Sequence, residues 1–182
     1  MSLRLFAAIA LPDDIATRLL ALMQGVPGAK WRPRENLHLT LRFFGEVDAP
    51  TADDLDAALA NIAAAAAPFE LQLKGAGAFG KDNPHTLWAG VGPSALLTKL
   101  AAACERAARR AGLKPETRKN APHVTLAYLG ASELARVRGF EARLGLFETR
   151  AFRVENFGLY SSWLSKSAPS QYRLEAEYAL RG

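Results

Sequence analysis

The chain is poor in the residues that build disulfides and metal centres: it has one cysteine, Cys104, and three histidines among 182 residues. A single cysteine excludes an intrachain disulfide and fits a reducing compartment. The histidines, His38, His85 and His123, are scattered and give no ligand cluster, so we expect no metal and no other cofactor. Cys104 lies in an alanine-rich helical run, where a buried apolar role is favoured over that of a nucleophile.

Long apolar runs are also missing from the sequence. No stretch approaches the roughly 20 residues that a membrane-spanning helix needs. The apolar start, residues 1–10, lacks a basic leader and runs directly into Pro12-Asp13-Asp14. This order is typical of a first strand followed by a helix, not of a signal peptide. We therefore expect a cytoplasmic protein without a membrane segment.

Acidic residues are outnumbered: 18 aspartates and glutamates stand against 23 lysines and arginines, and the formal net charge is +5. A basic surface attracts polyanions, which favours RNA, nucleotides and anionic lipids as partners. With 49% hydrophobic and 23% charged residues, the composition is that of an ordinary globular protein. The length suits one compact unit, and we expect residues 1–182 to form a single domain and a monomer.

Strand and helix patterns alternate along the chain, but several strands follow one another without a helix between them. That order predicts a mixed or antiparallel α+β fold rather than a doubly wound parallel one. Helices are predicted to begin at Pro12, at Thr51, where Asp54 completes a capping arrangement, and at Ser94. The predicted strands are Leu3–Ala10, Leu37–Phe44, Phe69–Lys74, His85–Val91, His123–Leu129, Phe152–Ser162 and Tyr172–Leu180.

A short internal repeat carries the chemistry. Residues 38–45, His-Leu-Thr-Leu-Arg-Phe-Phe-Gly, match residues 123–130, His-Val-Thr-Leu-Ala-Tyr-Leu-Gly. From this composition, His-x-Thr-Leu should follow a given histidine by accident about one time in a hundred, so two such motifs indicate a shared role. The third histidine, His85, lacks a threonine two residues on, and a turn or strand-start position is predicted for it.

Alternation along a strand gives each copy a polar face. His38, Thr40 and Arg42 should point one way and the intervening apolar residues the other, into the core. His123 and Thr125 should be arranged likewise. Two such strands related by an approximate twofold would line one cleft with two imidazoles and two hydroxyls.

That set of groups suits the opening of a cyclic phosphodiester. Histidine titrates near neutrality, so one imidazole can act as base on water while the other, protonated, acts as acid on the departing ribose oxygen. Threonine hydroxyls can donate hydrogen bonds to the non-bridging oxygens of a phosphate held between them. The pentacovalent transition state would be stabilised by these bonds and by nearby cations, and no metal is required.

The two motifs resemble those of the 2H phosphoesterase superfamily, which is named for its two His-x-Thr-x motifs. The nearer match is its RNA 2',3'-cyclic phosphodiesterase branch, also called 2'-5' RNA ligase or LigT-like. The resemblance covers nearly the whole chain. Beyond the motifs it includes Arg4–Ile9, Trp31, Asn36-Leu37, Gly45–Val47, Phe79, Leu87–Val91, Leu159–Leu164 and Tyr172.

The resemblance implies two pseudo-symmetric lobes, each an antiparallel or mixed sheet with helices outside, around a central cleft. It implies hydrolysis of a 2',3'-cyclic phosphate at an RNA end to a 2'-phosphate, with His38 as proton donor and His123 as proton acceptor. The residues themselves do not decide which histidine is the acid. Thr40 and Thr125 would bind the phosphate. The implied partners are RNAs with a cyclic phosphate or a 2'-5' linkage, tRNA fragments among them.

Further substrate-binding candidates are Arg42 and three aromatic residues, Phe79, Tyr128 and Tyr160, which could stack on a base. The chain also departs from the family pattern. Many members have arginine where this chain has Tyr128, and an aromatic residue where it has Asn120. The missing arginine could weaken the binding of phosphate or RNA, for which Arg42, Arg118 and Lys119 are candidates to compensate.

Three other functions compete with hydrolysis of RNA ends. The same site could run the reverse reaction, an ATP-independent joining of RNA through a 2'-5' linkage, although water at about 55 M favours hydrolysis unless the ends are held together. The substrate could instead be a small cyclic phosphate on a nucleotide or ADP-ribose. The alternative outside catalysis is an RNA-binding module, which the presence of both histidines and both threonines disfavours.

Overall fold

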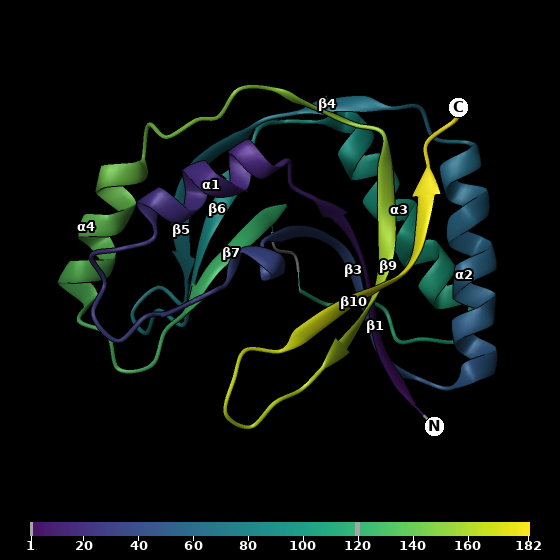
Figure 1. The fold of residues 1–182 in the computed structure, drawn as a ribbon, viewed down its shortest axis with the longest axis horizontal. Helices are drawn as coiled ribbons and strands as arrows, with labels where there is room; N and C mark the ends of the chain where they lie inside the picture. Colours follow the sequence, from purple (N-terminus) through teal and green to yellow (C-terminus); the bar gives the residue numbers. More distant parts are fainter. Residues whose placement is uncertain (1, 119–120) are drawn as a thin grey trace.

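A computed structural model describes residues 2–118 and 121–182 (Figure 1). Lys119 and Asn120, which the sequence analysis named, lie outside the described residues. Over the described ranges the strands form an eight-stranded sheet, in the order β10-β9-β1-β3-β7-β6-β5 with β2 added to β7, and a separate two-stranded ribbon of β4 and β8. All pairings are antiparallel. The predicted α+β class is confirmed.

The chain begins with β1, which lies inside the main sheet, and continues through the following elements. The helices are α1 (Asp13–Leu22), the short 3-10 turn η1 (Arg34–Asn36), α2 (Ala49–Ala64), α3 (Ala95–Arg110) and α4 (Leu134–Leu144). The strands are β1 (Leu3–Ala10), β2 (Lys30–Trp31), β3 (His38–Val47), β4 (Phe69–Leu71), β5 (Leu73–Phe79), β6 (Thr86–Val91), β7 (His123–Tyr128), β8 (Phe152–Val154), β9 (Asn156–Trp163) and β10 (Gln171–Ala179).

The protein has two lobes, and the boundary between them runs between strands β3 and β7 of the main sheet. Figure 1 shows α2 and α3 beside β1, β3, β9 and β10, and α1 and α4 beside β5, β6 and β7. The apolar core is continuous through both lobes and includes residues from each of these helices, such as Leu19, Leu59, Leu100 and Phe140. The lobes are therefore packed against each other as well as joined by the sheet.

An approximate twofold relates the two lobes, and the strand registers reveal it. Leu39 of β3 pairs with Val124 of β7, and these are the second residues of the two motifs. On the outer side of each motif strand lies an equivalent neighbour, β1 beside β3 and β6 beside β7, each paired antiparallel. The next strands out, β9 and β5, also correspond, because Tyr160 pairs with Phe6 as Phe79 pairs with Thr86.

Both motif strands contain a β-bulge at the same motif position. In β3 the register passes from Thr40, opposite Ala8, to Arg42, opposite Ala7, so that Leu41 is the extra residue. In β7 it passes from Thr125 to Ala127 in the same way, and Leu126 is extra. A bulge reverses the alternation of side chains beyond it. The predicted faces therefore hold in each motif from the histidine to the threonine. The predicted face is wrong for Arg42, which turns toward Glu105 on α3.

The helix starts confirm some sequence predictions and correct others. Ser94 caps α3, because its hydroxyl accepts a hydrogen bond from the backbone N–H of Leu97 at 3.2 Å. The predicted start of α2 at Thr51 is wrong. Asp48 is the cap, its carboxylate accepting from the N–H of Thr51 at 3.0 Å, and the helix begins before the proline at position 50. Asp48 is the better acceptor because the helix can then include that proline in its first turn.

Several elements differ from the predicted pattern. The single strand predicted over Phe69–Lys74 is divided between β4 and β5, which belong to different sheets, and β2 was not predicted. Helix α4 was not predicted, although Val137, Phe140 and Leu144 supply a buried stripe at helical spacing. The single strand predicted over Phe152–Ser162 is two strands, because β8 pairs with β4 in the ribbon and β9 pairs with β1 in the main sheet.

Among the described residues, the structure contains no helix whose length and apolarity would let it cross a membrane.

Candidate active site

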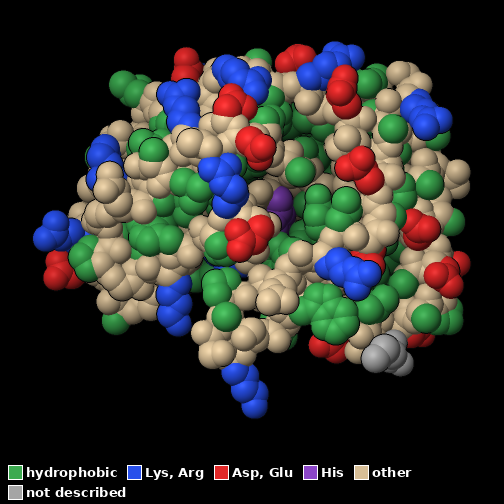
Figure 2. Space-filling view, in the orientation of Figure 1, with side chains coloured by type: hydrophobic (Ala, Val, Ile, Leu, Met, Phe, Trp, Pro, Cys, Tyr) green, Lys and Arg blue, Asp and Glu red, His purple; other side chains and the backbone are tan. Residues whose placement is uncertain are grey.

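The two motifs meet in one cleft between the lobes. The cleft has a volume of about 450 Å³ and is lined by His38, Thr40, His123 and Thr125 together with residues from β1 and β10 and with Arg32, which follows β2. In Figure 2 a histidine side chain is visible at the bottom of a hollow near the centre of the displayed face. The sequence prediction that two imidazoles and two hydroxyls share a cleft is thus consistent with the geometry.

His38 is held by aromatic rings and by its own motif threonine. Its ring stacks on Phe6, with centroids 4.9 Å apart, and meets the edge of Tyr172 at 5.2 Å. Its Nε2 lies 3.1 Å from the hydroxyl oxygen of Thr40, a hydrogen bond whose direction depends on the tautomer. These contacts fix the plane of the imidazole and direct Nε2 toward the cleft.

His123 is held in a comparable way from the other lobe. Its Nδ1 lies 2.8 Å from the carbonyl oxygen of Ala121, which can only accept, so Nδ1 carries a proton. The neutral ring therefore has its lone pair on Nε2, the nitrogen available to a substrate. Phe79 packs edge-on against the ring with centroids 4.9 Å apart.

The protein lowers the pKa of both imidazoles. Burial is the main cause at His38, aided by the positive charge of Arg32 and, when His123 is protonated, by that of His123. The pKa of His38 falls from 6.5 to about 4 despite a hydrogen bond with the backbone of Asn36. At His123 burial again dominates and Arg118 adds to it, while the bond to Ala121 opposes the shift. Both rings are therefore neutral at pH 7 in the empty cleft.

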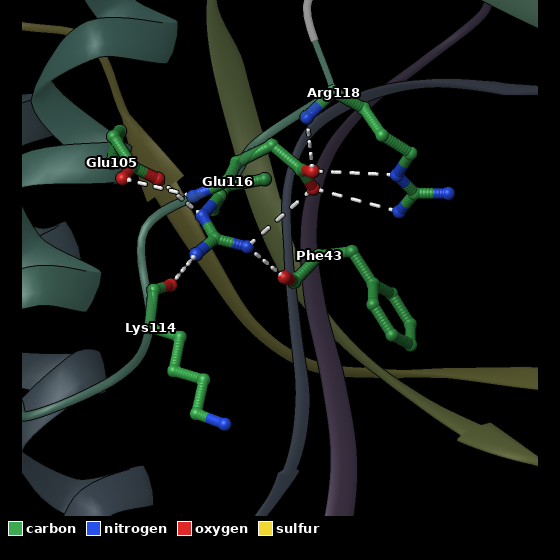
Figure 3. A network of polar contacts seen from close by, with 6 residues as sticks. Phe43, Glu105, Lys114, Glu116 and Arg118 are labelled. Atoms are coloured by element: carbon green, nitrogen blue, oxygen red, sulfur yellow. Dashed lines mark hydrogen bonds and ion pairs between the residues drawn. The ribbon is translucent and has the colours of Figure 1, made fainter.

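Arg42 borders the cleft, but its guanidinium is used to join parts of the protein. It donates to the carboxylate of Glu105 on α3 at 2.5 Å, to the carbonyl of Lys114 at 2.7 Å and to the carbonyl of Phe43. Glu116 lies 3.8 Å away and accepts from the backbone N–H of Arg118. Figure 3 shows these labelled partners around the guanidinium of Arg42. The network ties β3 to α3 and to the segment that leads toward His123.

The three aromatic candidates occupy different places. Tyr128 lines the cleft and is exposed. Phe79 and Tyr160 are half-buried and are not part of the cleft lining. They contact it through a second ring, Phe79 against His123 and Tyr160 stacked on Phe6 at 5.3 Å. Phe79 and Tyr160 flank the two histidines as equivalents under the pseudo-twofold.

Several cleft residues were not singled out as site candidates from the sequence. Phe6 and Tyr172 were noticed as family-pattern residues, without a role at His38. Arg32 lines the cleft and lowers the pKa of His38, and no sequence motif indicated it. Its neighbour Trp31, which precedes the first motif, was the available signal.

The remaining reactive residues lie elsewhere. Cys104 is buried, and burial raises the pKa of its thiol to about 12, which excludes a nucleophilic role at neutral pH. His85 is exposed just before β6, as predicted, and its Nδ1 contacts the hydroxyl of Thr86 at 2.9 Å. Within the described ranges, no three residues among His, Cys, Asp and Glu come together as a metal-binding group.

The fold and cleft define a class of protein: a bilobal α+β protein with a two-histidine, two-threonine site suited to acid–base chemistry on an anionic ester. The sequence profile of the 2'-5' RNA ligase superfamily matches residues 11–162, and the chain belongs to this superfamily.

Relatives and solved structures agree with this assignment. An RNA 2',3'-cyclic phosphodiesterase of Aeropyrum pernix is 36% identical over 148 residues, 80% of this chain and 82% of that protein. The enzyme of the same name from Aquifex aeolicus is 30% identical over 173 residues, 93% of this chain and 92% of that one. The crystal structure of E. coli LigT complexed with 3'-AMP superposes with a TM-score of 0.81 at 26% identity and covers 100% of both chains.

Proposed function

We propose that this protein hydrolyses 2',3'-cyclic phosphates at RNA ends to 2'-phosphates, with His38 as proton donor and His123 as proton acceptor. The observation that carries the proposal is the convergence of two pseudo-symmetric His-x-Thr motifs on one cleft. The names of the relatives from Aeropyrum pernix and Aquifex aeolicus support the same reaction.

The proposed reaction is a single displacement at phosphorus. Nε2 of His123 takes a proton from water, and the oxygen of that water attacks the phosphorus. The bond from phosphorus to the 3'-oxygen breaks, and His38 gives its proton to that oxygen, so the phosphate stays on the 2'-oxygen. One proton enters the histidine pair and one leaves it, and exchange with solvent restores the starting state.

The hydrogen bond of His123 supports its role as the base. Because the carbonyl of Ala121 holds the proton on Nδ1, the lone pair of Nε2 is ready to accept a proton from water. Thr40 and Thr125, on the cleft lining, would donate to the non-bridging oxygens of the phosphate. Tyr128, Phe79 and Tyr160 remain candidates for contacts with the nucleoside, whereas the paired guanidinium of Arg42 favours a supporting role.

His38 must be protonated to act as the acid, yet its pKa in the empty cleft is the more strongly lowered of the two. A bound anionic phosphate opposes that shift through its charge. Its negative charge favours the imidazolium and offsets the repulsion from Arg32. The proposed mechanism therefore includes uptake of a proton by His38 on substrate binding.

The proposal extends to RNA ends in general, tRNA fragments among them, and to a cytoplasmic monomer with residues 1–182 as a single bilobal domain. Ligation through a 2'-5' linkage is the reverse of the same chemistry, and the high concentration of water favours hydrolysis. A small nucleotide is the second candidate substrate, because a cleft of about 450 Å³ is of the size that holds one small ligand.

A comparison of substrates tests the proposal. Initial rates are measured on a short RNA ending in a 2',3'-cyclic phosphate and on the matching cyclic mononucleotide. We expect turnover of the RNA to a product that carries a 2'-phosphate and no 3'-phosphate. A preference for the mononucleotide would move the assignment to the small-nucleotide candidate. Absence of turnover on both, or a 3'-phosphate product, would contradict the proposal.

A further inference from the structure

The pairing of β2 with β7, which the sequence pattern did not predict, places Arg32 at the cleft. Trp31 of β2 pairs with Ala127 of β7, and the backbone N–H of Arg32 donates to the carbonyl of Leu126 at 2.8 Å. Trp31 packs toward Phe140 of α4, with ring centroids 5.8 Å apart. The next side chain along an extended segment points the other way, and Arg32 accordingly lines the cleft.

The guanidinium of Arg32 is buried without a counter-ion. Arg32 is 9% exposed, and in the part of the chain that the structure describes no carboxylate lies within 4.0 Å of it. Its side chain donates a hydrogen bond to the hydroxyl of Tyr172 at 3.2 Å. It lies over the rings of Tyr128 and Tyr172, at 5.1 and 5.9 Å from their centroids. Two rings stabilise a cation only partly, so this position favours an anion.

The other arginines of the cleft are engaged or more open to solvent. Arg42 is bound by Glu105 and two carbonyls, and Arg118 is paired with Glu116 at 3.3 Å. Arg4 is half-buried over the ring of Phe43, at 5.0 Å from its centroid. Arg32 thus combines burial, a free set of N–H donors and a place in the cleft, which the other three do not.

Tyr172 connects Arg32 to His38. Its hydroxyl accepts from Arg32, and its ring edge meets the imidazole of His38 at 5.2 Å between centroids. The charge of Arg32 is also one of the causes that lower the pKa of His38. The negative charge of an anion held by Arg32 would oppose that effect.

We propose that Arg32 binds the phosphate of the substrate on the His38 side of the cleft. The guanidinium presents parallel N–H donors to two phosphate oxygens, a geometry that lysine cannot reproduce. In this way the residue that follows β2 supplies a cation beside Tyr128, which itself stands where many family members have arginine. The part of the proposal that concerns turnover rests on the proposed function, whereas phosphate binding does not.

The test compares Arg32→Gln with the matched control Arg34→Gln. Arg34 lies two residues away, is exposed, and donates to Thr17 and to the carbonyl of Asp13, outside the cleft. Two quantities are measured: the dissociation constant of inorganic phosphate, from the rise in melting temperature with concentration, and kcat/KM on cyclic-phosphate RNA. The first does not depend on any activity.

For Arg32→Gln we expect phosphate binding and kcat/KM each to fall by about 10- to 100-fold, the loss expected for a charge-assisted pair of hydrogen bonds. Arg34→Gln should stay within about threefold of the unaltered protein. Values within threefold for both quantities in folded Arg32→Gln would overturn the proposal. If the unaltered protein turned over no cyclic phosphate, the proposed function would fail, and the phosphate measurement would still decide the role of Arg32.

A folding defect would not leave the question open. Arg32→Met keeps an apolar stem between the two tyrosine rings and repeats the test if Arg32→Gln does not fold. In the unaltered protein, the Nε–Hε resonance of Arg32 can also be followed by NMR as inorganic phosphate is added. We expect this resonance to move with saturation, and a resonance that stays in place would contradict the proposal.

Discussion

Leu39 and Val124 form the single residue pair that joins β3 to β7 among the described residues, and each directly follows a cleft histidine. Both side chains are buried in the core. Because successive residues of a strand face opposite sides, anchoring these two side chains turns His38 and His123 to the other face together. The geometry of the cleft is thus set at the same point where the lobes meet.

Arg42 is expected to matter for stability more than for the chemical step. In Arg42→Met the carboxylate of Glu105 and the carbonyls of Phe43 and Lys114 lose their donor. Because Glu105 is partly open to solvent, losing this donor costs about 1–3 kcal/mol in the free energy of unfolding. Urea denaturation measures this loss, with Arg106→Met, an exposed change on α3 beside Glu105, as control. A loss below about 1 kcal/mol would show that the network does not stabilise the fold.

Thr40 and Thr125 are expected to bind phosphate without carrying protons. Thr→Val at either site keeps the shape of the side chain and deletes one hydrogen bond to a charged group, worth about 1.5–3 kcal/mol. We expect kcat/KM to fall by about 10- to 150-fold while its bell-shaped pH dependence remains. Loss of either limb of the bell in a valine variant would mean that the hydroxyl takes part in proton transfer.

His38 is expected to titrate far below the usual range in the empty cleft. Burial lowers its pKa to about 4, so its NMR titration midpoint should lie well below 6.5 in phosphate-free buffer and rise when phosphate is added. The sign for stability follows from the same shift. Between pH 6.5 and 4 the unfolded chain binds a proton that the folded chain does not, so stability should fall as pH falls through this window. A midpoint near 6.5 would contradict this.

Chelators are expected to leave the activity unchanged, because the proposed mechanism uses two imidazoles and hydrogen-bond donors throughout. Rates on cyclic-phosphate RNA are compared before and after dialysis against EDTA. Activity that disappears on dialysis and returns with zinc or manganese would replace the two-histidine mechanism with a metal-assisted one.

The repeated motif predicted the two histidines and two threonines of the cleft, because a pattern of eight residues that occurs twice can be recognised without tertiary information. The bulges at Leu41 and Leu126 could not be predicted in the same way. They arise from the registers of the neighbouring strands β1 and β6, which come from other parts of the chain. For that reason the strand alternation correctly oriented His38 but not Arg42.

Arg32 and α4 were missed for different physical reasons. The position of Arg32 depends on the two-residue strand β2 adding to β7, a pairing too short to leave a periodic pattern. Helix α4 does have buried residues at helical spacing, but Gly139 in its interior lowers the helix propensity of the segment. Packing of Phe140 and Val137 into the core outweighs that cost.

The most direct test of the central claim is the pH dependence of kcat/KM for His38→Ala and His123→Ala on cyclic-phosphate RNA. We expect each folded variant to lose about 100-fold or more in turnover. His123→Ala should lack the acidic limb of the bell, as expected for loss of the base, and His38→Ala the alkaline limb, as expected for loss of the acid. Loss of the opposite limbs would exchange the two roles. Near-normal turnover in either folded variant would contradict the two-histidine mechanism itself.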